Sequence, residues 1–177
     1  MTSKQKQCLL YYLGFYSGAI DGIFGPASEA ATRAFQSAWG LPVDGIFGAQ
    51  TEAAARAAVA DPDSFWTTVR YFKKDEFRCR CGSCGGFPAQ PRQVLVTLAD
   101  KVREHFGAAC HISSGVRCES HNKAVGGVRN SRHLLGKAMD FRTEGVAAKD
   151  VLTFLDTLPE VRYCYAIDAN FVHMDIA

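Results

Sequence analysis

The sequence predicts an α+β protein in which a small helical region at residues 1–60 precedes a larger region of mixed strands and helices. Two observations support this prediction. A short motif occurs twice within the first sixty residues, each time before an alanine-rich stretch with helical spacing. Beyond residue 76, short apolar runs of strand length alternate with loops and with two longer segments of helical character.

The repeated motif is Asp-Gly-Ile-Phe-Gly, which begins at Asp21 and again at Asp44. In each copy Asp-Gly is typical of a tight turn, Ile and Phe are expected to be buried, and the last Gly lets the backbone turn into a helix. Ser28 and Thr51 are expected to be the N-caps of these helices, each followed by a glutamate in the favourable first turn. The repeat therefore predicts two similar turn–helix units.

This repeated pattern resembles the small three-helix type of peptidoglycan-binding domain. The hallmark of that domain is a repeated D-G-x-x-G followed by T-x-x-A-(V/L)-x-x-F-Q, and residues 32–36 match the end of it. The resemblance covers roughly residues 4–60 and implies that residues 1–60 bind bacterial peptidoglycan. Taken without the resemblance, the same residues would build a helical bundle with no assigned ligand.

Residues 61–76 are predicted to be a linker, because residues 60–64 are rich in Asp and contain Pro. The second domain is then expected at residues 77–177. Helices are predicted over 92–106 and 147–158. Strands are predicted over 111–114, 138–141, 163–167 and 171–176. This mixture favours an α+β domain.

Charge and hydropathy exclude several classes of partner. The chain has 20 basic and 18 acidic residues and a net charge of +2, so no nucleic-acid partner is indicated. No apolar run approaches the roughly 18 residues that span a bilayer, so no membrane insertion is expected. The first fifteen residues do not fit a secretory signal peptide. The protein is therefore expected to be made in the cytoplasm or exported by a route that the sequence does not reveal. We also expect a monomer.

Two histidines and several carboxylates lie in glycine-rich or strand-edge settings of the second domain. His133 and Asp140 are separated by a loop containing Gly136, so a return from loop to strand could bring both side chains to one point. His173 and Asp175 share one face of a predicted strand, since side chains alternate. Catalytic zinc sites use three imidazole or carboxylate ligands and leave a fourth position open. The spacing is compatible with such a site, and also with ordinary core or surface histidines.

These residues belong to an ordered string that runs S-G-x-R, H-N, G-G, S-x-H-x-x-G-x-A-x-D and F-V-H-x-D. The string is similar to that of the M15-type metallopeptidases, the zinc group that includes D-Ala-D-Ala carboxypeptidases and hedgehog-like domains. The similarity extends from about residue 77 to the C-terminus and implies an α+β domain with a mainly antiparallel sheet. It also implies that His133, Asp140 and His173 bind Zn²⁺.

The resemblance assigns further roles. Arg117 matches the family arginine that contacts the substrate carbonyl or carboxylate, and its donors could stabilise an oxyanion. Ser131 matches the serine of the S-x-H element, close to the bound substrate. Asp175 is expected either to support His173 or to contact the substrate.

The general base is the position at which this sequence departs from the family pattern. Some relatives have Glu or Asp three residues before the last zinc histidine, whereas this chain has Asn170 there. Asp168 is the nearest carboxylate, at an offset where some relatives carry a catalytic residue, and is therefore the candidate base. The alternative is that Asp168 only forms the turn.

The cysteines offer a second interpretation. Cys79, Cys81 and Cys84 are close enough to bind a metal, but three thiols fall short of a structural zinc site. Three others could complete the set in the folded protein: Cys110, Cys118 and Cys164. The alternatives are a disulfide or free thiols. A cysteine hydrolase would need a thiol beside a histidine, and His121 follows Cys118 by three residues.

Together the two resemblances imply a Zn²⁺-dependent hydrolase that cuts an amide bond in the stem peptide or cross-link of peptidoglycan. Arg117 and Asp168 are the expected catalytic residues. A phage or prophage endolysin is the expected setting, because such an enzyme accumulates in the cytoplasm before it acts on the cell wall. The alternatives are a bacterial wall-remodelling D,D-carboxypeptidase and a non-catalytic wall-binding protein with a structural zinc.

Overall fold

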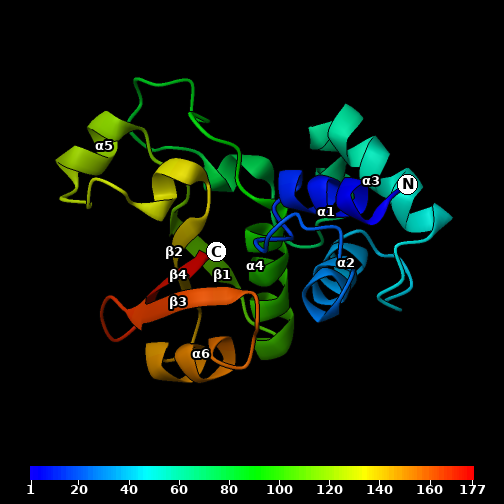
Figure 1. Cartoon of the computed structure of the whole chain (residues 1–177). Coiled ribbons are helices and arrows are strands. Elements are labelled where there is room, and N and C mark those ends of the chain that lie inside the picture. The colour runs from blue at the N-terminus through cyan, green and yellow to red at the C-terminus, as the bar shows by residue number, and fades with distance from the viewer. The chain divides into compact units, whose positions relative to one another are not determined.

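A computed structural model describes residues 1–177, which divide into two units, Met1–Arg70 and Tyr71–Ala177. The first unit is helical, and the second contains a four-stranded sheet with helices (Figure 1). This confirms the predicted α+β class. None of the helices combines the length and the apolar character that crossing a bilayer requires.

The first unit contains three α-helices and one 3-10 helix. These are α1 (Ser3–Tyr12), α2 (Pro26–Ala38), α3 (Ala49–Ala60) and η1 (Pro62–Thr67). The core is built from all three α-helices, with Leu10, Phe35 and Ala55 fully buried. Phe15 packs edge-on against Phe35 at 5.3 Å between ring centroids. The predicted three-helix bundle is confirmed.

A buried glutamine organises the second copy of the repeat. The Gln36 side-chain amide donates to the Asp44 carboxylate at 2.7 Å and to the Ile46 carbonyl at 3.1 Å. It also donates to the Thr51 hydroxyl at 3.1 Å, while its oxygen accepts the Gly45 N–H at 2.9 Å. The Gln36 side chain thus makes hydrogen bonds to the Asp-Gly turn, to the backbone that follows it and to Thr51 in the first turn of α3.

Gln7 on α1 makes the matching set of bonds in the first copy. Its amide donates to Asp21 at 2.9 Å, to the Ile23 carbonyl at 3.1 Å and to the Ser28 hydroxyl at 3.3 Å. Its oxygen accepts the Gly22 N–H at 2.8 Å. The two copies are therefore equivalent in their hydrogen bonds as well as in sequence.

The predicted N-caps are wrong. Gly25 and Gly48 occupy the N-cap positions, and neither helix has a side-chain cap. Ser28 and Thr51 lie inside the first turns, where they are buried. Their hydroxyls are used by the two glutamines, an interaction between distant segments that local sequence does not show.

The isoleucines of the motif are exposed, contrary to prediction. Ile23 is 73% exposed and Ile46 is 65% exposed, whereas Phe47 is only 3% exposed. In both copies the Asp carboxylate accepts the Ile N–H at 2.8 Å, which fixes a tight turn. The turn directs the isoleucine outward and leaves the following phenylalanine to pack on the core.

The predicted linker at residues 61–76 contains folded structure. Phe65 in η1 packs on Trp39 of the first unit at 6.1 Å between ring centroids. Phe72 is buried in the second unit and packs on Phe77, at the end of η2 (Lys74–Phe77), at 6.0 Å. The boundary between the units therefore lies between these two phenylalanines.

The second unit consists of η2, a sheet and four further helices. The strands are β1 (Cys110–Ser114), β2 (Ala138–Thr143), β3 (Val161–Ala166) and β4 (Phe171–Ile176), in the order β1-β2-β4-β3 with antiparallel neighbours. The helices are α4 (Gln93–Phe106), α5 (Glu119–Ala124), η3 (Arg132–Leu135) and α6 (Ala148–Leu155). Both predicted helices and all four predicted strands are present. The short η2, α5 and η3 were not predicted.

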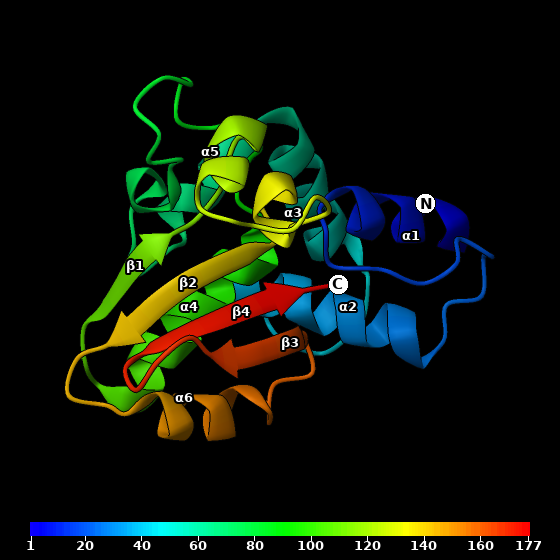
Figure 2. The same ribbon diagram turned by 90° about the vertical axis from the view of Figure 1, so that its left-hand side faces the viewer.

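One face of the sheet forms the core of this unit. Helices α4 and α6 pack against the sheet and against each other (Figure 2). Alternate residues of the two central strands are fully buried: Met139, Phe141, Val172 and Met174. The residues between them must then point to the opposite face, because side chains alternate along a strand. That opposite face includes Asp140 and His173.

We expect the Gln36→Ala protein to lose about 2–3 kcal/mol of stability in the first unit, because the Gly45 N–H and the Ile46 carbonyl lose their partner. Both tryptophans, Trp39 and Trp66, lie in that unit, so tryptophan fluorescence during urea denaturation reports its unfolding. Gln50→Ala, at an exposed position of α3, is the control and should leave the midpoint nearly unchanged. Equal midpoints for both variants would contradict the role of Gln36.

Candidate metal centre

A row of side chains crosses the sheet on its polar face. Asp140 on β2 lies opposite His173 on β4, and His173 lies opposite Tyr165 on β3. Directly opposed residues of antiparallel strands have their side chains on the same face and about 5 Å apart. The Tyr165 ring stacks on the His173 imidazole at 4.9 Å between centroids.

The structure brings His133, Asp140 and His173 together. His173 Nδ1 lies 2.7 Å from Asp140 Oδ1, and His133 Nε2 lies 3.2 Å from the same oxygen. The two histidine nitrogens are 3.4 Å apart. All three side chains are buried, and their ligand atoms form a group that could hold a metal ion.

The remaining ring nitrogens of both histidines have partners. His133 Nδ1 lies 2.6 Å from the Gly115 carbonyl oxygen, and His173 Nε2 lies 3.7 Å from Asp175 Oδ2. Metal-binding histidines typically direct their second nitrogen to a carbonyl or a carboxylate. The His133 contact is of hydrogen-bond length, whereas the His173 contact is an ion-pair distance. Two imidazole nitrogens and one carboxylate oxygen, without a fourth protein ligand, fit a catalytic zinc site.

Asp140 is held as a carboxylate. Burial favours its neutral form, but hydrogen bonds to His133 and His173 and the charge of Arg117 outweigh burial, so its pKa lies well below the usual value. The charged form is the one that binds a metal cation.

Arg117 contacts this group directly. Its guanidinium forms an ion pair with Asp140 Oδ2 and donates through Nε to the Ser114 hydroxyl at 2.8 Å. An extra residue in β1, Ser113, shifts the register so that Ser114 lies opposite Asp140. The bulge thereby places the hydroxyl that holds the arginine beside the candidate ligand.

Asp175 lies on β4 next to the site, two residues after His173. It is buried and accepts two hydrogen bonds from Arg162, each 2.8 Å long. Arg162 is the extra residue of a second bulge, in β3. With this bidentate contact, Asp175 Oδ2 lies 3.7 Å from His173 Nε2, and its role beside the imidazole or the substrate stays a prediction.

Asp168 lies in the turn between β3 and β4. Its Oδ1 accepts the backbone N–H groups of Asn170 and Phe171, each at 2.8 Å. These two bonds lower the pKa of Asp168. No hydrogen bond or ion pair joins Asp168 to the three residues of the metal group, and its role as a base stays a prediction.

Ser131 and His133 are positioned by η3. Ser131 is buried and precedes the helix without capping it through its side chain. The His133 carbonyl accepts the Arg117 N–H at 3.1 Å. This hydrogen bond and the one between His133 Nδ1 and the Gly115 carbonyl join η3 to the segment that follows β1.

Several residues of the site were not identified from the sequence. Tyr165 and Arg162 contact the predicted residues, yet neither lies in a pattern that indicates chemistry. Ser114 is the serine of the S-G-x-R element, but its hydrogen bond to Arg117 was not predicted. The only available signal was strand alternation, which places Tyr163 and Tyr165 on one face. Their contacts depend on the pairing of β3 with β4 and on the two bulges.

Comparison with known proteins agrees with both domains. Residues 70–175 match the Peptidase M15 family, and residues 4–54 match a putative peptidoglycan binding domain. The chain is similar to a zinc D-Ala-D-Ala carboxypeptidase from Streptomyces albus G, with 38% identity over 128 residues. That alignment covers 69% of this chain and 49% of the relative, so the chain spans about half the length of the relative.

The family match includes all but the last residue of the sheet, together with η3 and the three residues of the metal group. It agrees with the donor set that the structure brings together and with the helical unit that precedes it. The chain belongs to the peptidase M15 family, with a putative peptidoglycan-binding domain at its N-terminus.

Proposed function

We propose that this protein is a zinc-dependent peptidase that hydrolyses an amide bond in the peptide part of bacterial peptidoglycan. The observation that carries this proposal is the convergence of His133, Asp140 and His173 next to Arg117. The match of residues 4–54 to a putative peptidoglycan binding domain supports the same substrate.

His133, Asp140 and His173 would hold the zinc ion. Zinc in such a site supplies Lewis-acid activation of the scissile carbonyl and of the attacking water. Burial of the three side chains lowers the local dielectric constant and strengthens each electrostatic interaction there.

Arg117 is proposed to act on the substrate. Its Nε is held by Ser114 and one terminal nitrogen contacts Asp140, so the guanidinium is fixed in orientation. The rest of its donors could bind the developing oxyanion or a stem-peptide carboxylate. Ser131, two residues before His133, is the proposed second substrate contact.

Asp168 is the proposed proton acceptor. Its carboxylate is ionised at neutral pH, as a base requires, while the turn hydrogen bonds lower its pKa and make it a weaker proton acceptor. Both turn bonds use Oδ1, which leaves Oδ2 to accept a proton. Asn170, the residue three positions before His173, has an amide and cannot serve in this way.

The proposed setting is that of an endolysin, supported by the union of a wall-binding type of domain with a peptidase domain in one chain. The second candidate is a wall-remodelling D,D-carboxypeptidase, favoured by the name of the similar Streptomyces albus G protein. The two differ in products: a carboxypeptidase releases only a terminal D-Ala, whereas an endopeptidase separates peptides or cross-links.

Treatment with a zinc chelator should abolish hydrolysis of purified muropeptides, and added Zn²⁺ should restore it. His133→Ala should reduce the rate at least about 100-fold, because one of three ligands is lost. His111→Ala, at an exposed position of β1, is the matched control and should retain activity. Mass spectrometry of the products identifies the bond. Hydrolysis that resists the chelator but is stopped by thiol alkylation would instead indicate a cysteine hydrolase.

Asp168→Asn should lower the hydrolysis rate about 100-fold or more while zinc binding is retained, because the amide cannot accept the proton. The asparagine oxygen can still accept the two turn hydrogen bonds, so the β3–β4 turn should persist. Zinc content and circular dichroism check both points. A rate equal to that of the wild type would assign Asp168 to the turn alone.

Arg117→Lys keeps the charge but removes the planar fork of donors. We expect kcat/KM to fall about 100-fold. A fall in kcat would indicate oxyanion stabilisation, and a rise in KM would indicate binding of a substrate carboxylate. Arg129→Lys, at an exposed position, is the control. Unchanged kinetics in Arg117→Lys would remove the arginine from the mechanism.

A further inference from the structure

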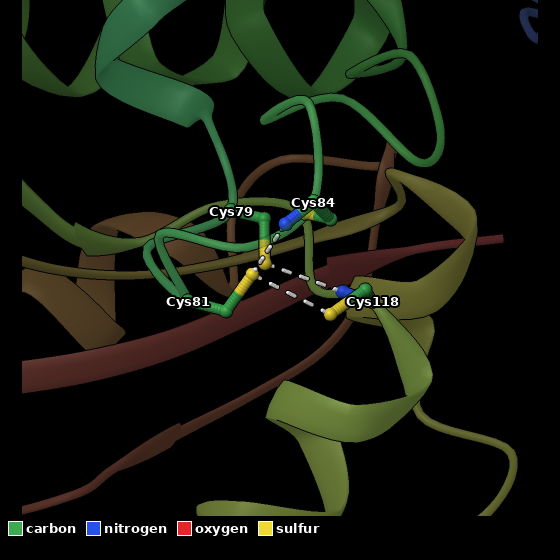
Figure 3. Close-up of side chains that lie close together, drawn as sticks. All are labelled: Cys79, Cys81, Cys84 and Cys118. Carbon is green, nitrogen blue, oxygen red and sulfur yellow. Dashed lines mark hydrogen bonds between the residues drawn. The ribbon is translucent and has the colours of Figure 1, made fainter.

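Four cysteines converge at a second place in the Tyr71–Ala177 unit. Cys79, Cys81 and Cys84 lie on the segment between η2 and α4, and Cys118 is the N-cap of α5. Figure 3 shows the four side chains around one small space. Their sulfur atoms all lie within 4.8 Å of one another. These four residues are called the tetrathiol cluster below.

The spacing of the sulfur atoms fits a shared metal ion. Zinc binds cysteine sulfur at about 2.3 Å, which in a tetrahedron places the sulfurs about 3.8 Å apart. Cys118 Sγ and Cys81 Sγ are 3.7 Å apart. A disulfide would require about 2.05 Å, and all seven cysteines are free in the structure.

Backbone N–H groups are directed at the sulfur atoms. Cys84 N–H donates to Cys81 Sγ at 3.2 Å, and Cys118 N–H donates to Cys79 Sγ at 3.4 Å. The His121 N–H donates to Cys118 Sγ at 3.4 Å. Charged acceptors form stronger hydrogen bonds than neutral ones, so these donors favour thiolates, the form in which cysteine binds metal.

The cluster also has the four protein ligands that are typical of a structural zinc site. Four thiolates complete a tetrahedral shell and leave no position for water or substrate. The Cys79 N–H donates to the Gly86 carbonyl at 2.6 Å, which closes the loop that carries three of the four thiols. None of the three residues of the His133 group takes part, so the two groups are separate.

We propose that Cys79, Cys81, Cys84 and Cys118 bind one structural zinc ion, distinct from the ion held by His133, Asp140 and His173. Binding would release the thiol protons to solvent, with no change in oxidation state. The ion would fasten the segment at residues 79–86 to the start of α5.

The position of Cys118 gives this zinc ion a role. Cys118 directly follows Arg117. Arg117 and Gly115 both contact residues of the candidate metal centre. The Gly115 carbonyl contacts His133 Nδ1, and the Val116 N–H donates to the Phe77 carbonyl at 2.8 Å. A metal at the tetrathiol cluster would therefore fix both ends of the strand-to-helix segment that orients Arg117 and His133.

The test is the metal content of the full chain, purified with a reductant from cells supplied with zinc. Elemental analysis should give about two zinc ions per chain. The cobalt-substituted protein should show an intense thiolate-to-cobalt charge-transfer band in the near ultraviolet. His133→Ala should lose one ion but keep that band, so the result does not depend on peptidase activity.

Cys81→Ser and Cys118→Ser should each lose the charge-transfer band and one zinc ion, with Cys164→Ser as the matched control outside the cluster. About one zinc ion in the wild type, no thiolate-to-cobalt band, and loss of the remaining ion in His133→Ala would overturn the proposal. So would alkylation and intact-mass analysis showing a disulfide within the cluster in protein kept reduced. The wild-type measurements decide even if a variant does not fold.

Discussion

The pairing of β2 with β4 is the constraint on which the Tyr71–Ala177 unit depends. Its register runs from Ala138 opposite Asp175 to Arg142 opposite Phe171 and includes the pair Asp140 and His173. A shift of one residue would turn Asp140 into the core and Met139 toward solvent. Burial of the apolar face and assembly of the metal centre therefore require the same register. The free energy of core packing therefore also holds in place the two candidate ligands on these strands, Asp140 and His173.

The loops around the sheet position the site residues that lie outside the strands. His133 lies outside the sheet, and its orientation depends on the Gly115 carbonyl. Gly115 itself needs to lack a side chain, because a Cβ there would lie 2.3 Å from the Phe77 carbonyl oxygen. The segment after β1 is thus held against η2 on one side and η3 on the other. The tetrathiol cluster is attached to the same segment through Cys118.

Most of the fold could be predicted because its signals are local. The 92–106 helix and the four strands follow from side-chain periodicity, and each appears within a few residues of its predicted bounds. The errors are equally informative. Ser28 looks like an N-cap by position, but its hydroxyl is used by Gln7, a partner more than twenty residues away. Ile23 looks like a core residue, but the turn made by Asp21 directs it outward.

The sequence by itself determined the two-part α+β organisation and the group of His133, Asp140 and His173, because periodicity and an ordered motif are written in the chain. Only the tertiary structure decided which groups surround that centre. The ion pair of Arg117 with Asp140 and the support of Asp175 by Arg162 arise from strand register and two bulges. The fourth thiol could be any of three cysteines in sequence, and the path of the chain after β1 selects Cys118. Contacts between distant segments depend on packing in three dimensions, which local residue patterns do not encode.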